Sequence, residues 1–163
     1  MLKYKNAGHN FKLMDEKNDL VEIEYTFNSN GVLRIHNINR TSWGEQIKYQ
    51  EYHLGTTAMN LLIGELRTQN KNVGIIKGTL SNYQAKEYWG NSLPFYFHFP
   101  NYFTYPNLAA VFHLFYDEEY KNEIVLNENT LKQDVDSLIM YSIKYNADLY
   151  FYYEIVEMKA VKE

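Results

Sequence analysis

The chain has 163 residues, a formal net charge of −4 at pH 7, and 45% hydrophobic and 17% aromatic residues. This composition excludes a disordered chain, and the length fits one domain spanning residues 1–163. Cysteine is absent, which excludes disulfides and thiolate catalysis. Lysine and arginine form no basic stripe, so the sequence argues against nucleic-acid binding.

The sequence contains no apolar run with the length of a signal-peptide core or a bilayer span. We therefore expect a cytoplasmic protein without membrane contact. Tyrosine is unusually common, with 16 copies. Because tyrosine covers apolar surface with a polar tip, the excess fits a sheet with one wet face or a lined cleft. Compositional bias explains it equally well.

The first half of the chain alternates apolar and polar residues in the manner of strands. Leu20–Phe27 and Val32–Asn39 alternate with period two, and Asn28-Ser29-Asn30-Gly31 separates them. Asn-Gly readily adopts positive φ, so the pattern predicts an antiparallel hairpin. Residues 40–53 are polar and irregular and predict a loop.

From Leu54 the apolar residues follow a helical period. The spacing i, i+4, i+7, i+8, i+12 is occupied by Leu54, Ala58, Leu61, Leu62 and Leu66. We expect this helix to end near Asn70, and a buried strand to come next at Val73–Leu80.

The second half predicts two more helices and two more strands. The helices are expected at residues 82–90 and Thr130–Tyr145, and the strands at Leu108–Tyr116 and Ala147–Met158. The whole order is β-β-loop-α-β-α-β-α-β. It predicts an α/β (α+β) fold with a mixed, mostly antiparallel sheet and flanking helices.

The junction between the predicted loop and the first helix is the most informative segment. It consists of small residues around one glycine: His53, Leu54, Gly55, Thr56, Thr57 and Ala58. The N–H groups of a first helical turn point outward and the helix dipole favours an anion, so such a start can cradle a phosphate. Ordinary helix capping by Gly and Thr is the more common explanation of the same pattern.

The succession of motifs from this helix onward resembles the GCN5-related N-acetyltransferase (GNAT) family. In that family a Gln/Arg-x-x-Gly-x-Gly/Ala loop opens a helix and holds the pyrophosphate of acetyl-CoA. A strand then ends in an Asn-x-x-Ala-like turn, and the next helix carries a tyrosine. Gly55 takes the place of the first loop glycine, Asn82 and Ala85 match the turn, and Tyr96 matches the tyrosine.

The resemblance implies an acyl-CoA N-acyltransferase-like fold with acetyl-CoA as co-substrate and an unknown amine as acceptor. It implies cofactor contacts by His53, Leu54, Gly55, Thr56, Thr57, Ala58 and Asn82, and a general-acid role for Tyr96 on the departing thiolate. The pattern departs from that of the family at several places, one of which is Pro100-Asn101-Tyr102 in place of the usual Gly-Phe ending. Tyr52 stands where the family has Gln or Arg, and Thr57 stands where it has Gly or Ala.

His36 is the candidate general base, since it lies on the strand before the cofactor loop and histidine is the residue type suited to accept a proton near neutral pH. Glu22 and Glu24 share one strand face and are alternatively the solvent face of the hairpin. His98 and His113 stand among aromatic residues and are expected in the core or at its rim. Histidine pairs with the i, i+4 spacing of a helical metal site are absent, so we expect no metal.

Two alternatives to an N-acetyltransferase stay open. A relative that has lost the second loop glycine is a non-catalytic binding or assembly module, and an unrelated α/β protein can carry a Gly-Thr helix start by chance. The aromatic cluster, made of Tyr88-Trp89 and the run from Phe95 to Phe103, either lines an acceptor cleft or forms a self-association surface, as in a homodimer.

Overall fold

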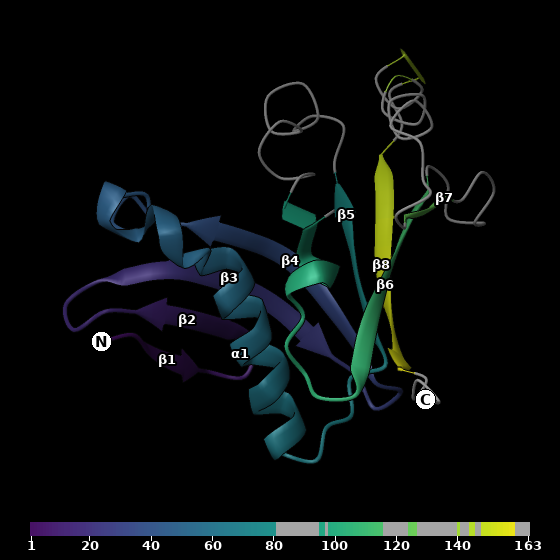
Figure 1. Cartoon of the computed structure of the whole chain (residues 1–163), viewed down its shortest axis with the longest axis horizontal. Coiled ribbons are helices and arrows are strands. Elements are labelled where there is room, and N and C mark those ends of the chain that lie inside the picture. Colours follow the sequence, from purple (N-terminus) through teal and green to yellow (C-terminus); the bar gives the residue numbers. More distant parts are fainter. Residues whose placement is uncertain are drawn as a thin grey trace, which may run out of the picture. The chain divides into compact units, whose positions relative to one another are not determined.

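The computed structural model describes residues 1–80, 95, 96, 98–115, 124–126, 140, 144, 145 and 148–158, and for residues 50–52, 80, 115 and 124–126 it describes the backbone alone. The chain forms two compact units (Figure 1). Unit 1 comprises Met1–Gly74 and Phe103–Tyr105, and unit 2 comprises Ile75–Tyr102 and Pro106–Glu163. Each unit has strands and a buried core of its own.

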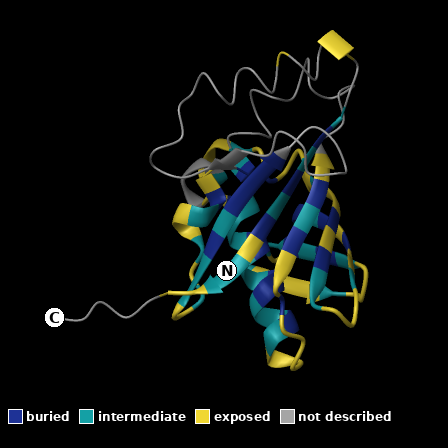
Figure 2. Cartoon of the chain, turned by 90° about the vertical axis from the view of Figure 1, so that its right-hand side faces the viewer, coloured by how far each residue is buried: buried dark blue, intermediate teal, exposed yellow. Residues whose placement is uncertain are grey.

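Unit 1 contains an antiparallel sheet in which each strand pairs with the next along the chain. Its strands are β1 (Lys3–Asn6), β2 (Asn10–Met14), β3 (Asp19–Phe27) and β4 (Val32–Arg40). Alternation gives the sheet one buried and one exposed face: Leu33 and Ile35 of β4 are buried, whereas Arg34 and His36 are exposed. Figure 2 shows the same alternation as dark blue and yellow bands along the strands.

The turn between β3 and β4 is closed by its own side chains and by the chain that comes after the helix. The Oδ1 of Asn28 accepts the N–H groups of Asn30 and Val32, at 2.9 and 3.0 Å. Gly31 has a φ of +81°, and its carbonyl accepts the N–H of Gly74 at 2.9 Å. A Cβ on Gly31 would lie 2.8 Å from the Asn72 carbonyl oxygen, so backbone conformation and space both require glycine here.

The helix α1 (Leu54–Thr68) packs its apolar stripe on the buried face of this sheet. It contacts β2, β3 and β4, and Figure 1 shows it lying across one face of the sheet. Full burial of a large aliphatic side chain contributes about 1.5–3 kcal/mol, so the stripe is a principal source of stability in unit 1. Its buried residues are Leu54, Ala58, Met59, Leu62, Ile63 and Leu66.

The last turn of α1 is held by an arginine. Arg67 donates from Nη2 to the carbonyl of Val73 at 3.0 Å, and its guanidinium carbon lies 4.3 Å from the ring centre of Tyr105. A cation at a helix C-terminus is favoured by the helix dipole, and its stacking on an aromatic face adds attraction. Arg67 thereby ties residues 103–105 to unit 1.

Residues 41–53 connect β4 to α1 and include the 3-10 helix η1 (Ile47–Tyr52). The loop begins pressed against the start of β3. The N–H of Thr41 donates to the Leu20 carbonyl at 2.9 Å, and Gly44 is buried beside the same carbonyl. A Cβ added to Gly44 would collide with that oxygen.

Unit 2 contains a second set of antiparallel strands, in the spatial order β5-β8-β6-β7. The strands are β5 (Ile75–Leu80), β6 (Leu108–Phe115), β7 (Ile124–Leu126) and β8 (Leu149–Glu157), and the described part also includes the 3-10 helix η2 (Phe99–Tyr102). Long, nearly continuous apolar and aromatic runs in β6 and β8 suit strands that are buried on at least one face.

Aromatic side chains form the core of unit 2. The rings of Phe99 and Phe112 lie 5.2 and 5.0 Å from the ring of Tyr153, centroid to centroid, and all three residues are buried. The hydroxyl of Tyr153 donates to the carbonyl of Tyr96 at 2.6 Å, so the buried phenol is satisfied. Aromatic packing with tilted or edge contacts therefore holds Tyr96 and Phe99 against β8, and β8 against β6.

Most predicted elements are confirmed. The hairpin of β3 and β4, the helix from Leu54, and the strands β5, β6 and β8 end close to the predicted bounds, and the predicted α+β class with mostly antiparallel pairing is confirmed. The sequence patterns do not predict β1, β2 or β7. The predicted helices at residues 82–90 and Thr130–Tyr145 lie outside the described residues, apart from helical backbone at Met140, Lys144 and Tyr145.

Replacing Gly44 by alanine should lower the free energy of unfolding by about 1–3 kcal/mol, because the added methyl group overpacks the contact with the Leu20 carbonyl. Gly64→Ala is the matched control, since no atom lies within 4 Å of a Cβ built at Gly64. Alanine favours a helix over glycine by about 1 kcal/mol, so the control should gain stability. Urea unfolding of both variants measures the difference, and a Gly44→Ala protein as stable as the control contradicts the close contact.

Candidate functional site

The predicted cofactor-binding residues other than Asn82 lie together at the start of α1, in unit 1. The helix begins at Leu54, and His53 is its N-cap residue. Gly55, Thr56, Thr57 and Ala58 therefore belong to the first turns of the helix. Asn82 lies outside the described residues.

The backbone at this junction presents amide groups in the manner of an anion-binding helix start. His53 adopts the left-handed conformation, with φ 46° and ψ 58°, and its carbonyl accepts the N–H of Thr57 at 2.9 Å. The N–H groups of Leu54, Gly55 and Thr56 precede this first intrahelical hydrogen bond. The side chain of His53 makes no capping hydrogen bond, and the first turn carries no acidic residue that would repel an anion.

Burial divides this segment into anchors and exposed positions. Leu54 and Ala58 are fully buried and hold the helix start against the sheet. Gly55, Thr56 and Thr57 are partly exposed. Leu54 can therefore serve an anion through its backbone N–H, while the small side chains of the exposed positions leave room for a ligand to approach.

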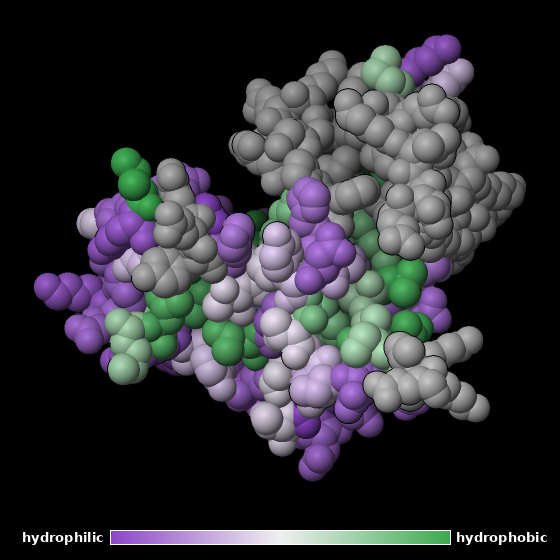
Figure 3. All heavy atoms as spheres, viewed as in Figure 1, coloured by the Kyte–Doolittle hydropathy of each residue, from purple (hydrophilic) through white to green (hydrophobic). Residues whose placement is uncertain are grey.

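The loop that leads into this helix keeps large apolar side chains in solvent. Trp43 is 50% and Ile47 84% exposed. Figure 3 shows isolated green residues among the purple ones that prevail on the outer surface of unit 1. Single exposed apolar side chains are common on protein surfaces, and the sequence patterns did not single these two out as site residues.

His36, the candidate general base, lies on the exposed face of β4. Its Nε2 is 3.1 Å from the hydroxyl of Thr26 on the neighbouring strand β3. Because Leu33 and Ile35 point to the buried face on which α1 packs, the alternation places His36 on the opposite face of the sheet from the helix. Glu22 and Glu24 lie half-exposed and exposed on β3, as the solvent-face alternative predicts.

Tyr96, the candidate general acid, lies in unit 2 and is buried. Its ring packs against Phe151, with 4.3 Å between centroids, and against Phe95 at 5.0 Å. Burial raises the pKa of the Tyr96 phenol well above its usual range, because the charged phenolate is poorly solvated there. The phenol therefore stays protonated at neutral pH.

The other histidines and aromatic residues also have defined places. His113 is buried, stacks on Tyr152 with 4.2 Å between ring centroids, and its Nε2 lies 3.4 Å from Oε2 of Glu154. This confirms the expected aromatic surroundings of His113, whereas His98 is exposed. Phe99 and Tyr96 are core residues, while Tyr102 of the same predicted cluster is half-exposed.

Membrane-spanning helices and metal-binding clusters are both absent from the part of the chain that the structure describes. None of its helices has both the length and the apolar character needed to cross a bilayer. Among the same residues, His, Asp and Glu form no group of three that could hold a metal ion.

Comparison with known proteins found similar solved structures but no sequence family. No protein-family model matches the chain, and no curated protein matches its sequence. The chain is similar to Ard1 from Thermoplasma volcanium, with 9% identity and a TM-score of 0.49 over 92% of this chain and 72% of that one. It is also similar to the ribosomal-protein-S18-alanine N-acetyltransferase from Escherichia coli, with 12% identity and a TM-score of 0.46 over 98% of this chain and 76% of that one.

A third similar structure is the diaminobutyrate acetyltransferase EctA from Paenibacillus lautus, in complex with L-2,4-diaminobutyric acid and coenzyme A. It shares 10% identity and has a TM-score of 0.42 over 95% of this chain and 74% of that one. Acetyltransferases, the class that the sequence motifs resemble, are thus among the solved structures similar to this chain. Since each TM-score is below 0.5, the functional assignment depends on the geometry of α1.

The left-handed conformation of His53 predicts how this position responds to substitution. His53→Val should lower the free energy of unfolding by about 1–2 kcal/mol, because a β-branched residue is strained at positive φ. His53→Gly should be at least as stable as the wild type, since glycine adopts this conformation without strain. Thermal unfolding of the two variants measures the difference, and equal melting temperatures would refute a left-handed residue at the helix start.

Proposed function

We propose that the chain is an N-acetyltransferase-like protein that binds acetyl-CoA and transfers the acetyl group to an amine whose identity is open. The observation that carries this proposal is the start of α1. Its first-turn amides follow a left-handed N-cap residue, lack a side-chain cap from His53, and stand among small, partly exposed residues. A diphosphate has the charge and size that such a helix start favours.

The order of elements around this helix supports the same proposal. The helix α1 comes after the loop and β5 comes after α1, which is the succession implied by the resemblance to the GNAT family. Because Gly55 lies in the first turn and not before it, the amides of Leu54, Gly55 and Thr56 are the groups assigned to the diphosphate.

Acetyl transfer to an amine also needs proton transfer. The amine must lose a proton before it attacks the thioester carbonyl, and the departing thiolate must gain one. We assign the second step to Tyr96, whose phenol carries its proton at neutral pH. His36, the candidate base from the sequence, lies on the face of the sheet opposite α1, so in this proposal it would reach an amine bound at that helix only through water. The role of Tyr96 comes from the resemblance in the motifs, and that of His36 from its place on the strand before the loop.

The alternative is a binding or assembly module with the same fold and no catalysis. Two observations favour it: Tyr96 is packed into an aromatic core, and Thr57 occupies the position of the second loop glycine. A buried phenol can donate a proton only to a group that reaches it. Both proposed functions therefore include cofactor binding through α1, and they differ in whether the protein transfers the acetyl group.

Acetyl-CoA and free coenzyme A should each raise the melting temperature of the protein. A ligand that binds only the folded state at a hundred times its Kd adds about 2.7 kcal/mol of stability, which is about 5–10 °C for a chain of this size. Gly55→Trp should abolish the shift by filling the space before the first-turn amides. Gly64→Trp is the matched control, because nothing lies within 4 Å of a Cβ at that position on the same helix.

Pantetheine, which lacks the diphosphate, should give no comparable shift. A wild-type protein unaffected by millimolar coenzyme A would refute the proposal in both forms. A Gly55→Trp protein with the full response would show that the cofactor is held elsewhere.

If acetyl transfer is detected with a panel of amines, Tyr96→Phe should lower kcat by about a hundredfold, within the range of general-acid catalysis, while KM for acetyl-CoA changes little. Tyr102→Phe, at a half-exposed tyrosine nearby in sequence, is the control. Steady-state kinetics with both substrates varied gives the two constants. A variant with unchanged kcat and a raised KM would remove Tyr96 from the proton-transfer step.

A further inference from the structure

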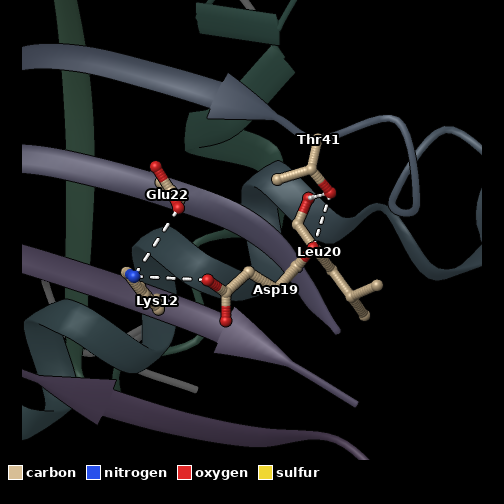
Figure 4. A network of polar contacts seen from close by, with 5 residues as sticks. All are labelled: Lys12, Asp19, Leu20, Glu22 and Thr41. Carbon is tan, nitrogen blue, oxygen red and sulfur yellow. Dashed lines mark hydrogen bonds and ion pairs between the residues drawn. The ribbon is translucent and has the colours of Figure 1, made fainter. Parts of the chain in front are cut away.

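The turn between β2 and β3 and the first residues of β3 hold the loop 41–53 at two separate places. The first contact lies where the loop begins. The hydroxyl of Thr41 donates to the carbonyls of Asp19 and Leu20, at 2.6 and 3.2 Å, and accepts the N–H of Gly44 at 3.2 Å. Figure 4 shows Thr41 reaching the backbone of Leu20, with the Asp19 side chain turned away toward Lys12.

The second contact lies in η1, close to the helix start. The hydroxyl of Tyr49 donates to Oδ2 of Asp15 at 2.6 Å. The other oxygen of the same carboxylate accepts the N–H groups of Lys17 and Asn18, at 2.8 and 2.7 Å. These bonds, from Tyr49 first and then from the backbone, lower the pKa of Asp15 to about 2, so the carboxylate is ionised throughout the physiological range.

These contacts leave the loop little freedom where it meets α1. Tyr49 stands only a few residues before His53, and Leu54 is fully buried on the other side of the junction. The left-handed turn at His53 is thus held between a charged hydrogen bond and a packed leucine. A binding site whose backbone is fixed before the ligand arrives loses less entropy on binding, which raises affinity.

We infer that Tyr49 and Asp15 are positioning residues that hold the first-turn amides of α1 in the geometry that binds a diphosphate. In this assignment they act through the loop and do not contact the ligand. The inference rests on the proposed function, since coenzyme A is the ligand whose binding reports on it.

Tyr49→Phe tests the inference by removing one hydroxyl and keeping the ring. Tyr4→Phe is the matched control: it removes a tyrosine hydroxyl that also donates to a carboxylate, Oε2 of Glu65 at 2.9 Å, elsewhere in unit 1. By calorimetric titration, Tyr49→Phe should weaken coenzyme A binding by up to about tenfold, the limit set by the strength of one hydrogen bond to a charged group. Tyr4→Phe should bind within about twofold of the wild type, the change expected for an exposed pair.

Amide hydrogen exchange supplies a second measurement that needs no ligand. Amides of residues 45–56 should exchange faster in Tyr49→Phe than in the wild type and in Tyr4→Phe, while those of β2 and β3 keep their protection. Unchanged exchange in this segment overturns the inference. So does a wild type that binds coenzyme A no more tightly than Tyr49→Phe, whereas a wild type that binds none overturns the proposed function and the inference together.

Discussion

The packing of α1 on the sheet of unit 1 is the constraint on which the candidate site depends. The buried stripe from Leu54 to Leu66 fixes the rotation of the helix about its axis, and Leu54 fixes its first residue in place. Because the stripe begins at the first helical residue, the end of the helix that carries the positive dipole is anchored and not frayed. The exposed side of the same turn consists of glycine and threonine, which are small enough to leave the amides accessible.

In unit 1, glycines stand at two places where the chain changes direction, and they allow close backbone contacts that a larger residue would prevent. Gly31 and Gly44 each sit against a carbonyl oxygen that leaves no room for a Cβ. In unit 2 the core is filled instead by phenylalanine rings that pack around Tyr153. Tyr96 belongs to that aromatic packing and is also the candidate proton donor, so the same ring is assigned to the core and to the chemistry.

The elements that the sequence predicts well are those whose signal is local. The period of α1, the Asn-Gly turn before β4 and the alternation of β3 are each readable within about fifteen residues, the window over which periodicity is informative. β1 and β2 are short strands of four and five residues, and alternation over such lengths arises easily by chance. The missed strands thus reflect a weak signal and not a misleading one.

The contacts that hold the candidate site in place join residues far apart in sequence, so no local sequence pattern predicts them. Thr41 and Leu20 are 21 residues apart, and Tyr49 and Asp15 are 34 residues apart, so only the fold brings them together. The left-handed conformation of His53 carries no sequence signal either, since neither glycine nor asparagine stands at that position. Sequence reasoning could place the helix start but not the contacts that hold it, and it could not show that the sheet separates His36 from α1.

The hydrogen bond between Gly74 and Gly31 closes the N-terminal segment of unit 1, and this early position in the chain bears on how the protein folds during synthesis. The pairings among β1, β2, β3 and β4 and the whole of α1 lie within Met1–Gly74, and each of these pairings joins strands that follow one another in sequence. Such short-range connectivity favours rapid folding, and nascent chains fold in the order in which they are synthesised. We expect this part to take shape on the ribosome before unit 2 is complete, with the ring of Tyr105 arriving later to cover Arg67.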